Sequence, residues 1–267
     1  MSAKILLAID ARANAVVTLN RPEVHNAFDP DMVLQLTKAL QRLNDDRAVR
    51  AVVLRGAGKS FCAGADIEQM KKSAEYSPQQ NFEVAQQSAR MFHALYTLQK
   101  PTLACVHGAV RGGGCGLVAA CDIAIAATQA TFRLSEVKIG VIPAMISPYV
   151  IAAIGERMAH RYMLTGEEFD AGEARRLGLV HETLERDALD ARVAALLAEL
   201  HSSGPNAVAA IKQLIPVSAH APIGPGIVDE TARRIAAVRA TPEAQEGLSA
   251  FLEKRKPSWA ADDEVSP

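Results

Sequence analysis

Two glycine-rich loops carry the residues of this chain whose types and spacing could do chemistry. The first loop, residues 56–67, follows an apolar segment and places three small residues, 63–65, ahead of an acidic helix start. Small residues let the main chain approach a ligand closely, so we interpret this loop as a source of N–H donors. Its Gly-Lys-Ser segment at 58–60 does not form a nucleotide-binding P-loop, because that motif requires a glycine where the chain has Val53.

The second loop, residues 106–117, contains three consecutive glycines, 112–114, at the expected start of an apolar helix. The dinucleotide fingerprint G-x-G-x-x-G fails here, because its last glycine would fall on Leu117. The first N–H groups of a helix have no intrahelical acceptor and lie at the positive end of the helix dipole. One such loop alone is more often a tight turn. Two loops of this kind predict a pair of donors for a negatively charged oxygen.

The carboxylate best suited to proton transfer is Glu136. It follows a strand-like segment, residues 131–134, and precedes an apolar stretch. Partial burial there would raise the pKa of the carboxylate toward a value useful in acid–base catalysis. The alternative is a surface glutamate at a helix start, and the residues alone leave the two interpretations evenly weighted.

The elements that must position these residues alternate between short β-branched runs and longer helical patterns, which predicts an α/β fold. The expected strands are residues 16–19, 51–54, 103–106 and 123–126. One helix should begin after Asp29 with Pro30 in its first turn, and another should bury a stripe from Phe82 to Tyr96.

Beyond about residue 144 we expect helices and no further strands. These helices should cover residues 188–200, 205–214, 227–238 and 242–254. The change in pattern divides the chain into a core with the active site, residues 1–190, and a C-terminal helical region, residues 191–267.

The composition excludes several classes of protein. With 49% hydrophobic and 22% charged residues and a formal net charge of −1, the chain suits a globular fold and has no field to attract nucleic acid. Its longest uncharged stretch is shorter than the roughly 20 residues of a membrane helix, and its first apolar run is too short for a secretory signal. The four cysteines lack the spacing of metal ligands. We expect a cytoplasmic protein with no metal, membrane or nucleic-acid partner.

Several segments also match a known family in order and spacing over nearly the whole chain. They are Asn20-Arg21-Pro22, Phe61 to Ile67, Gly112 to Cys115, Ser135 to Pro143, and Phe251 to Arg255. On these segments the chain resembles the crotonase superfamily, also called the enoyl-CoA hydratase/isomerase family. The resemblance implies a spiral of ββα units and a C-terminal helical region that forms a homotrimer, often a dimer of trimers. It implies an acyl-CoA thioester substrate and no cofactor beyond the coenzyme A that the substrate carries.

The resemblance also implies roles for particular residues. The N–H groups of Ala65 and Gly113 would hold the thioester oxygen, and Glu136 would be the catalytic acid and base. Phe251 and Lys254 would lie near the coenzyme A of this subunit or a neighbouring one. The complete set implied to bind substrate or coenzyme A is Ala63, Ala65, Asp66, Ile67, Glu68, Gly112, Gly113, Gly116, Phe251 and Lys254.

The chain departs from the family at Gly116, where hydratases typically carry the first of two glutamates. General acid–base catalysis is worth about 10² to 10⁴ in rate, so the loss of one acid weakens a hydratase without abolishing it. We expect reversible syn addition of water to a 2-enoyl-CoA. The first alternative is a 3,2-enoyl-CoA isomerase, which needs one acid only. The second is a catalytically silent member that binds acyl-CoA or RNA.

The segments around Gly112 and Glu136 most resemble bacterial methylglutaconyl-CoA hydratases, which serve leucine and acyclic-terpene breakdown. This resemblance suggests branched or carboxylated substrates such as 3-methylglutaconyl-CoA. Without a carboxylate at position 116, a substrate carboxylate would meet no like-charge repulsion there. Its candidate partners are Arg111, Arg133 and Lys138.

Overall fold

The computed structural model describes residues 3–263 and divides into two compact units. The first unit contains the chain up to residue 98 and residues 102–193, and the second contains residues 99–101 and the chain from residue 194 onward. The division falls inside α7 (Leu189–Ser202), beside the boundary at residue 190 that the sequence predicts.

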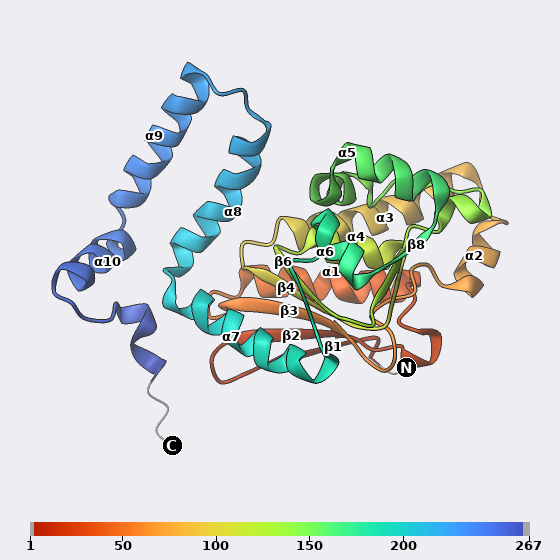
Figure 1. The fold of residues 1–267 in the computed structure, drawn as a ribbon, viewed down its shortest axis with the longest axis horizontal. Helices are drawn as coiled ribbons and strands as arrows, with labels where there is room; N and C mark the ends of the chain where they lie inside the picture. Colours follow the sequence, from red (N-terminus) through yellow and green to blue (C-terminus); the bar gives the residue numbers. More distant parts are fainter. Residues whose placement is uncertain (1–2, 264–267) are drawn as a thin grey trace. The chain divides into compact units, whose positions relative to one another are not determined.

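A six-stranded sheet forms the centre of the first unit (Figure 1). Its strands, in spatial order, are β1 (Ile5–Ile9), β2 (Asn14–Leu19), β3 (Ala51–Gly56), β4 (Thr102–Val106), β6 (Ile123–Ala127) and β9 (Glu182–Leu184). All neighbours pair in parallel except β1 and β2. Every residue of β4 is buried, as expected for a parallel strand covered on both faces. The α/β prediction is therefore confirmed.

A second, smaller sheet carries the approach to the glycine run. It contains β5 (Ala109–Arg111), β7 (Thr131–Arg133) and β8 (Glu168–Asp170), with β7 in the middle. The first glycine-rich loop follows β3, and the second follows β4 and includes β5. Because β3 and β4 are parallel neighbours, their carboxyl ends meet at one edge of the sheet, and both loops start there.

Helix α1 (Pro30–Asp45) forms as the sequence predicts. The Asp29 carboxylate caps it by accepting a hydrogen bond from the Met32 N–H at 2.8 Å, and Pro30 occupies the first helical position. Its buried face is built from residues spaced three and four apart, namely Met32, Leu36, Leu40 and Leu43.

The stripe predicted for the second helix is wrong in its first half and at its last residue, Tyr96, which is 37% exposed. Helix α3 (Pro78–Tyr96) begins with a capping box between Ser77 and Gln80, but Phe82 is 59% exposed. Burial is confined to the last part of the helix, at Met91, Phe92 and Leu95. The helix packs there against α1 and α4 (Gly113–Ala120), and its first turns, residues 78–83, lie at the surface.

The remaining helices of the first unit are short, apart from α5. They are η1 (Pro22–Val24), α2 (Ile67–Ser73), η2 (Glu136–Ile139), α5 (Ser147–Thr165), α6 (Ala171–Leu177) and η3 (Arg186–Ala188). Strands β8 and β9 contradict the expectation of no strand after residue 144. Each has three residues, which is too short for an alternating pattern to be read from sequence.

The second unit is helical throughout its described part (Figure 1). Its helices after α7 are α8 (Pro205–His220), α9 (Pro225–Arg239), α10 (Pro242–Leu252) and η4 (Ser258–Asp263). Each of α8, α9 and α10 has proline in its first turn, where the missing N–H costs nothing. Helices α8 and α9 contain no buried residue and carry exposed apolar side chains.

Candidate active site

The two glycine-rich loops lie against each other. Cys62 accepts a hydrogen bond from the Arg111 N–H at 2.9 Å and donates its own N–H to Ala109 at 3.3 Å, so the first loop pairs like a strand with β5. Gly64 then turns with φ +85°, and a Cβ atom there would lie 2.8 Å from the Arg111 oxygen and 3.6 Å from the Gly113 nitrogen. Only glycine fits this contact. It brings the main chain just before Ala65 beside the start of α4.

The Ala65 N–H points away from the protein segment that holds it. Phe28 pairs with this loop by donating its N–H to the Gly64 oxygen at 2.7 Å and accepting the Asp66 N–H at 2.8 Å. Neighbouring N–H groups of an extended chain point to opposite sides, so the Ala65 N–H faces away from Phe28. None of the hydrogen bonds among residues 3–263 uses it, and Ala65 is exposed.

Gly113 supplies the second free N–H. It is the first residue of α4, after Gly112 in a left-handed conformation with φ +48°, so its N–H has no acceptor within the helix. Phe28 closes the space beside it, because a Cβ atom on Gly113 would lie 2.8 Å from the Phe28 ring. A ligand oxygen near Gly113 would sit at the positive end of the α4 dipole.

The Glu136 carboxylate lies beside the same helix start. Its Oε1 atom would be 2.8 Å and its Oε2 atom 3.8 Å from a Cβ atom on Gly112. Oε2 is fully buried and has no hydrogen-bond partner in the described part of the chain. Burial raises the pKa of Glu136 above its ordinary value. An acid held in this way can both take up and release a proton.

Position 116 lies one helical turn beyond Gly112 and is closed by an apolar side chain. A Cβ atom on Gly116 would lie 2.2 Å from Ile146 Cγ2 and 3.0 Å from the Phe92 ring. Ile146 precedes the first turn of α5 and is buried. Position 116, where the family resemblance implies a second carboxylate in hydratases, is thus faced by hydrocarbon.

An aromatic row continues from this apolar contact. The Phe92 ring meets Phe28 edge to face at 6.3 Å between centroids, and Tyr149 at 6.2 Å. Tyr96 completes the row, 5.3 Å from Tyr149. The surroundings of Gly113 and Gly116 are therefore apolar, which suits the hydrocarbon part of an acyl group.

The other residues expected at the site lie in more varied places. Ala63 is half-buried and donates its N–H to His25, while Asp66 is buried and caps α2. Ile67 and Glu68 are exposed on the first turn of α2. Phe251 and Lys254 belong to the second unit, in the last turn of α10 and in the turn after it, and both are exposed.

Two of the three cations considered as partners for a substrate carboxylate already have partners. Arg111 binds Thr131 and the Glu168 carboxylate, and Arg133 donates to the Gly166 oxygen at 2.7 Å. Lys138 is exposed on η2, two residues from Glu136.

Sequence reasoning did not identify Phe28, Phe92 and Ile146 as neighbours of the site. They come from three separate segments and carry no motif, so only the folded chain shows that they meet the glycine run.

The two cysteines near the proposed donors, one in each loop, are structural. Burial raises the pKa of both Cys62 and Cys115 to about 12, so neither is a reactive thiolate near neutral pH.

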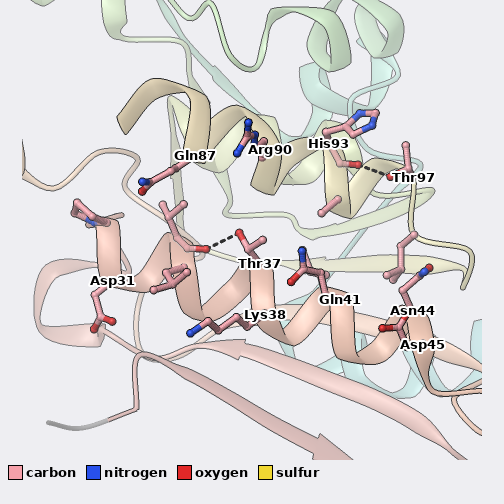
Figure 2. A pocket seen from close by; sticks show the side chains of 16 residues that line it. Asp31, Thr37, Lys38, Gln41, Asn44, Asp45, Gln87, Arg90, His93 and Thr97 are labelled. Carbon is pink, nitrogen blue, oxygen red and sulfur yellow. Dashed lines mark hydrogen bonds between the residues drawn. The ribbon is translucent and has the colours of Figure 1, made fainter. Parts of the chain in front are cut away.

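A separate cleft of about 1070 Å³ lies between α1 and α3 (Figure 2). Asp31 and Lys38 line it from α1, and Arg90 and His93 line it from α3 (Figure 2). It includes none of the residues that the sequence assigns to the site. Among residues 3–263 there is also no group of three metal-ligating side chains, and no helix with the length and apolar run needed to cross a membrane.

Comparison with known proteins identifies the family of the chain. A family model described as enoyl-CoA hydratase/isomerase matches residues 11–262. The crystal structure of an enoyl-CoA hydratase from Shewanella pealeana superimposes with a TM-score of 0.93 at 40% identity, covering 96% of each chain. The crotonyl-CoA hydratase of Syntrophomonas wolfei is 33% identical over 92% of this chain and 94% of its own. The (E)-benzylidenesuccinyl-CoA hydratase of Thauera aromatica is 34% identical over the same shares.

The family match spans both glycine-rich loops, Glu136 and most of the second unit. The structural match covers nearly the whole of both chains. The chain therefore belongs to the enoyl-CoA hydratase/isomerase family, within the crotonase superfamily.

Proposed function

We propose that this protein adds water reversibly and syn across the 2,3 double bond of a 2-enoyl-CoA. The observation that carries the proposal is the close approach of Gly64, which precedes Ala65, to the Gly113 nitrogen, with the Glu136 carboxylate beside Gly112 and no hydrogen-bond partner for its Oε2 in the described chain. The N–H pair suits a thioester oxygen that becomes negatively charged as the double bond is attacked. Coenzyme A enters as part of the substrate, and the proposal includes no other cofactor.

One acid accounts for both proton transfers. The Glu136 carboxylate takes a proton from water as the water oxygen bonds to C3 of the substrate, and the electrons move onto the thioester oxygen. The resulting enolate collapses, and C2 takes the proton from Glu136, which returns to the carboxylate form. Both new bonds form on the face where Glu136 lies, so the addition is syn. The raised pKa of Glu136 brings its proton affinity closer to that needed for the second step.

For the acyl group, we extend the proposal to branched or carboxylated 2-enoyl-CoAs such as 3-methylglutaconyl-CoA. The name of the Thauera relative records a hydratase whose substrate carries a succinyl group. In this chain Lys138 is the remaining candidate partner for a substrate carboxylate, because Arg111 and Arg133 bind protein groups. A marked preference of the purified protein for crotonyl-CoA over 3-methylglutaconyl-CoA in steady-state assays would refute this extension.

The main test uses mass spectrometry of products. The protein is incubated with short, branched and carboxylated 2-enoyl-CoAs and with a 3-enoyl-CoA. We expect a product heavier by one water from a 2-enoyl-CoA, and a loss of at least about 10²-fold in rate for Glu136→Gln. Glu156→Gln, at an exposed glutamate of α5, is the matched control and should keep full activity. No water addition by the wild-type protein to any of these substrates would overturn the proposal.

An isomerase that moves a 3-enoyl to a 2-enoyl thioester is the second candidate function. It is favoured by the hydrocarbon that fills position 116, since a proton shuttle between C2 and C4 needs one acid only. Conversion of the 3-enoyl-CoA without a change of mass would identify it. Binding of acyl-CoA without either reaction would identify a catalytically silent family member. Binding of RNA without either reaction would identify the RNA-binding form of that alternative.

We also propose that the protein is a cytoplasmic homotrimer or dimer of trimers. The support comes from the second unit, where Ile223, Phe251 and Leu252 are 99%, 80% and 78% exposed. Apolar side chains at this density on a helical surface favour contact with another chain. Phe251 and Lys254 would then lie near the coenzyme A of their own or a neighbouring subunit.

A further inference from the structure

A buried ion pair lies directly behind the first loop. Arg21 Nη2 is 2.9 Å from Asp66 Oδ2, and the side chains are only 14% and 9% exposed. Asp66 is joined by one peptide bond to Ala65, whose N–H is free. We infer that Arg21 and Asp66 are positioning residues that set the direction of the Ala65 N–H toward the thioester oxygen. This inference rests on the proposed function.

The Asp66 carboxylate has a separate partner for each oxygen. Oδ2 binds Arg21, while Oδ1 accepts the N–H groups of Glu68 at 2.8 Å and Gln69 at 3.2 Å, which caps α2. Rotation of this carboxylate would break contacts on both sides. The ion pair and the cap therefore fix the Asp66 side chain and the chain direction at residue 66, while the Phe28 N–H holds the Gly64 oxygen of the peptide that carries the Ala65 N–H.

Arg21 is fixed in turn by the segment that pairs with the loop. Its Nη1 donates to the Ala27 oxygen at 2.6 Å and lies 3.4 Å from the Asp29 carboxylate. The next residue, Phe28, is the one that binds Gly64 and Asp66 through its main chain. One guanidinium thus ties together both strands of the contact from which the Ala65 N–H projects.

Asn26 secures the same segment to the beginning of the loop. It is fully buried, accepts the Arg21 N–H at 2.8 Å, and donates its amide to the main-chain oxygens of Ala57, Ser60 and Phe61. The loop is therefore held at residues 57–61 by Asn26 and at residue 66 by Arg21. Ala65 lies next to the second attachment, so loss of the ion pair loosens that end while the main-chain bonds to Phe28 remain.

The geometry required of an oxyanion donor is narrow, because a displacement of about 1 Å can cost about 10² in rate. We therefore expect Arg21→Met and Asp66→Asn to lower kcat by about 10- to 100-fold with little change in KM. Asp66→Asn retains an oxygen to cap α2 and removes the charge that binds Arg21. Arg21→Lys should lie between wild type and Arg21→Met, because a lysine ammonium cannot bind Asp66 and Ala27 in the same fork.

A spectroscopic probe distinguishes a positioning role of Arg21 and Asp66 from a purely structural one. A cinnamoyl-CoA with an electron-donating ring substituent absorbs at longer wavelength when its carbonyl is polarised, and it reports the N–H pair without reaction at Glu136. We expect a red shift with wild type, a smaller shift with Arg21→Met and Asp66→Asn at saturation, and an intermediate shift with Arg21→Lys. The control is Lys4→Met, which removes the other partner of Asp29 without touching the loop and should keep the full shift.

Each outcome decides the inference. A full red shift and a kcat within twofold of wild type in both Arg21→Met and Asp66→Asn would overturn it while leaving the proposed hydratase intact. No red shift in the wild type would overturn both. If Arg21→Met fails to fold, Asp66→Asn decides, since its cap and its main-chain bonds to Phe28 remain.

Discussion

At the scale of single residues, the surroundings of the Glu136 carboxylate suit proton transfer but lower the stability of the folded chain. Its raised pKa means that the folded chain disfavours the ionised form, so wild-type stability falls as pH rises through that pKa. Glu136→Gln removes a buried charge whose Oε2 atom has no hydrogen-bond partner in the described part of the chain. We expect it to raise the free energy of unfolding by about 1 kcal/mol at neutral pH.

The gain in unfolding free energy from Glu136→Gln should depend on pH. Below about pH 4.5, the ordinary value for glutamate, the carboxyl is protonated in both folded and unfolded chains, so the gain from Glu136→Gln should vanish there. Thermal unfolding of both proteins between pH 4 and pH 8 measures it. Glu156→Gln, at the surface, should show no gain. An equal gain at both ends of this range would contradict the burial of the Glu136 carboxylate.

At Gly116, also a single-residue question, we expect packing to outweigh helix propensity in the effect of a substitution. Alanine normally stabilises a helix relative to glycine by about 1 kcal/mol. Here its Cβ would lie 2.2 Å from Ile146, so we expect Gly116→Ala to destabilise the chain by about 1–3 kcal/mol through overpacking. In an Ile146→Ala background the same change should become neutral or stabilising. A double-mutant cycle followed by denaturant unfolding measures the coupling.

Gly172 of α6 is the matched control, because a Cβ atom there meets only Asp170 Oδ1, at 3.3 Å. Gly172→Ala should change the free energy of unfolding by less than about 1 kcal/mol. Additive effects of Gly116→Ala and Ile146→Ala would show that Ile146 does not fill the space beside position 116.

At the scale of elements, one hydroxyl links α5 to α6. The buried Tyr162 donates to Glu173 Oε1 at 2.6 Å. Hydrogen bonds from Arg176 and then Tyr162 lower the pKa of Glu173 to about 2. Tyr162→Phe should therefore lower the free energy of unfolding by about 1 kcal/mol at pH 7. The exposure of Glu173 to solvent keeps the loss at this modest size.

The contribution of Glu173 to stability depends on pH in the opposite sense to that of Glu136. A lowered pKa stabilises the fold above about pH 4.5 and loses this effect as pH falls toward 2. The cost of Tyr162→Phe should thus shrink in strong acid, which denaturant unfolding at pH 7 and pH 2 would show. Tyr149→Phe is the control, because no hydrogen bond of the Tyr149 hydroxyl occurs in the described chain, and its effect should not depend on pH over this range.

Elements with local signals were predictable, and elements made by distant partners were not. The Asp29 cap and the apolar spacing that follows it defined α1, and the glycine spacing located both loops. By contrast, β8 and β9 exist because β7 and β6 pair with them, and Phe82 is exposed because its part of α3 lies at the surface. Ile146 and Arg21 act across long stretches of chain, so neither had a local pattern that revealed its contacts with the two loops.

At the scale of the whole molecule, the site depends on a sheet in which parallel neighbours end at one edge. That arrangement places the loops after β3 and β4 together although their sequences are about fifty residues apart. In the second unit, helices α8 and α9 bury none of their residues within the chain. A unit with so little interior of its own would gain stability if other copies covered its apolar residues, as the proposed trimer requires.

Self-association should therefore depend on the second unit. We expect the wild-type protein to sediment as a trimer or a dimer of trimers, and Phe251→Asp together with Leu252→Asp to shift it toward the monomer, because burial of either charge in an apolar contact is costly. Leu6→Ser is the matched control, since Leu6 is an exposed apolar residue of β1 in the first unit. Sedimentation velocity over a range of concentrations measures all three proteins. A monomeric wild type, or dissociation by Leu6→Ser alone, would show that these α10 residues do not hold the subunits together.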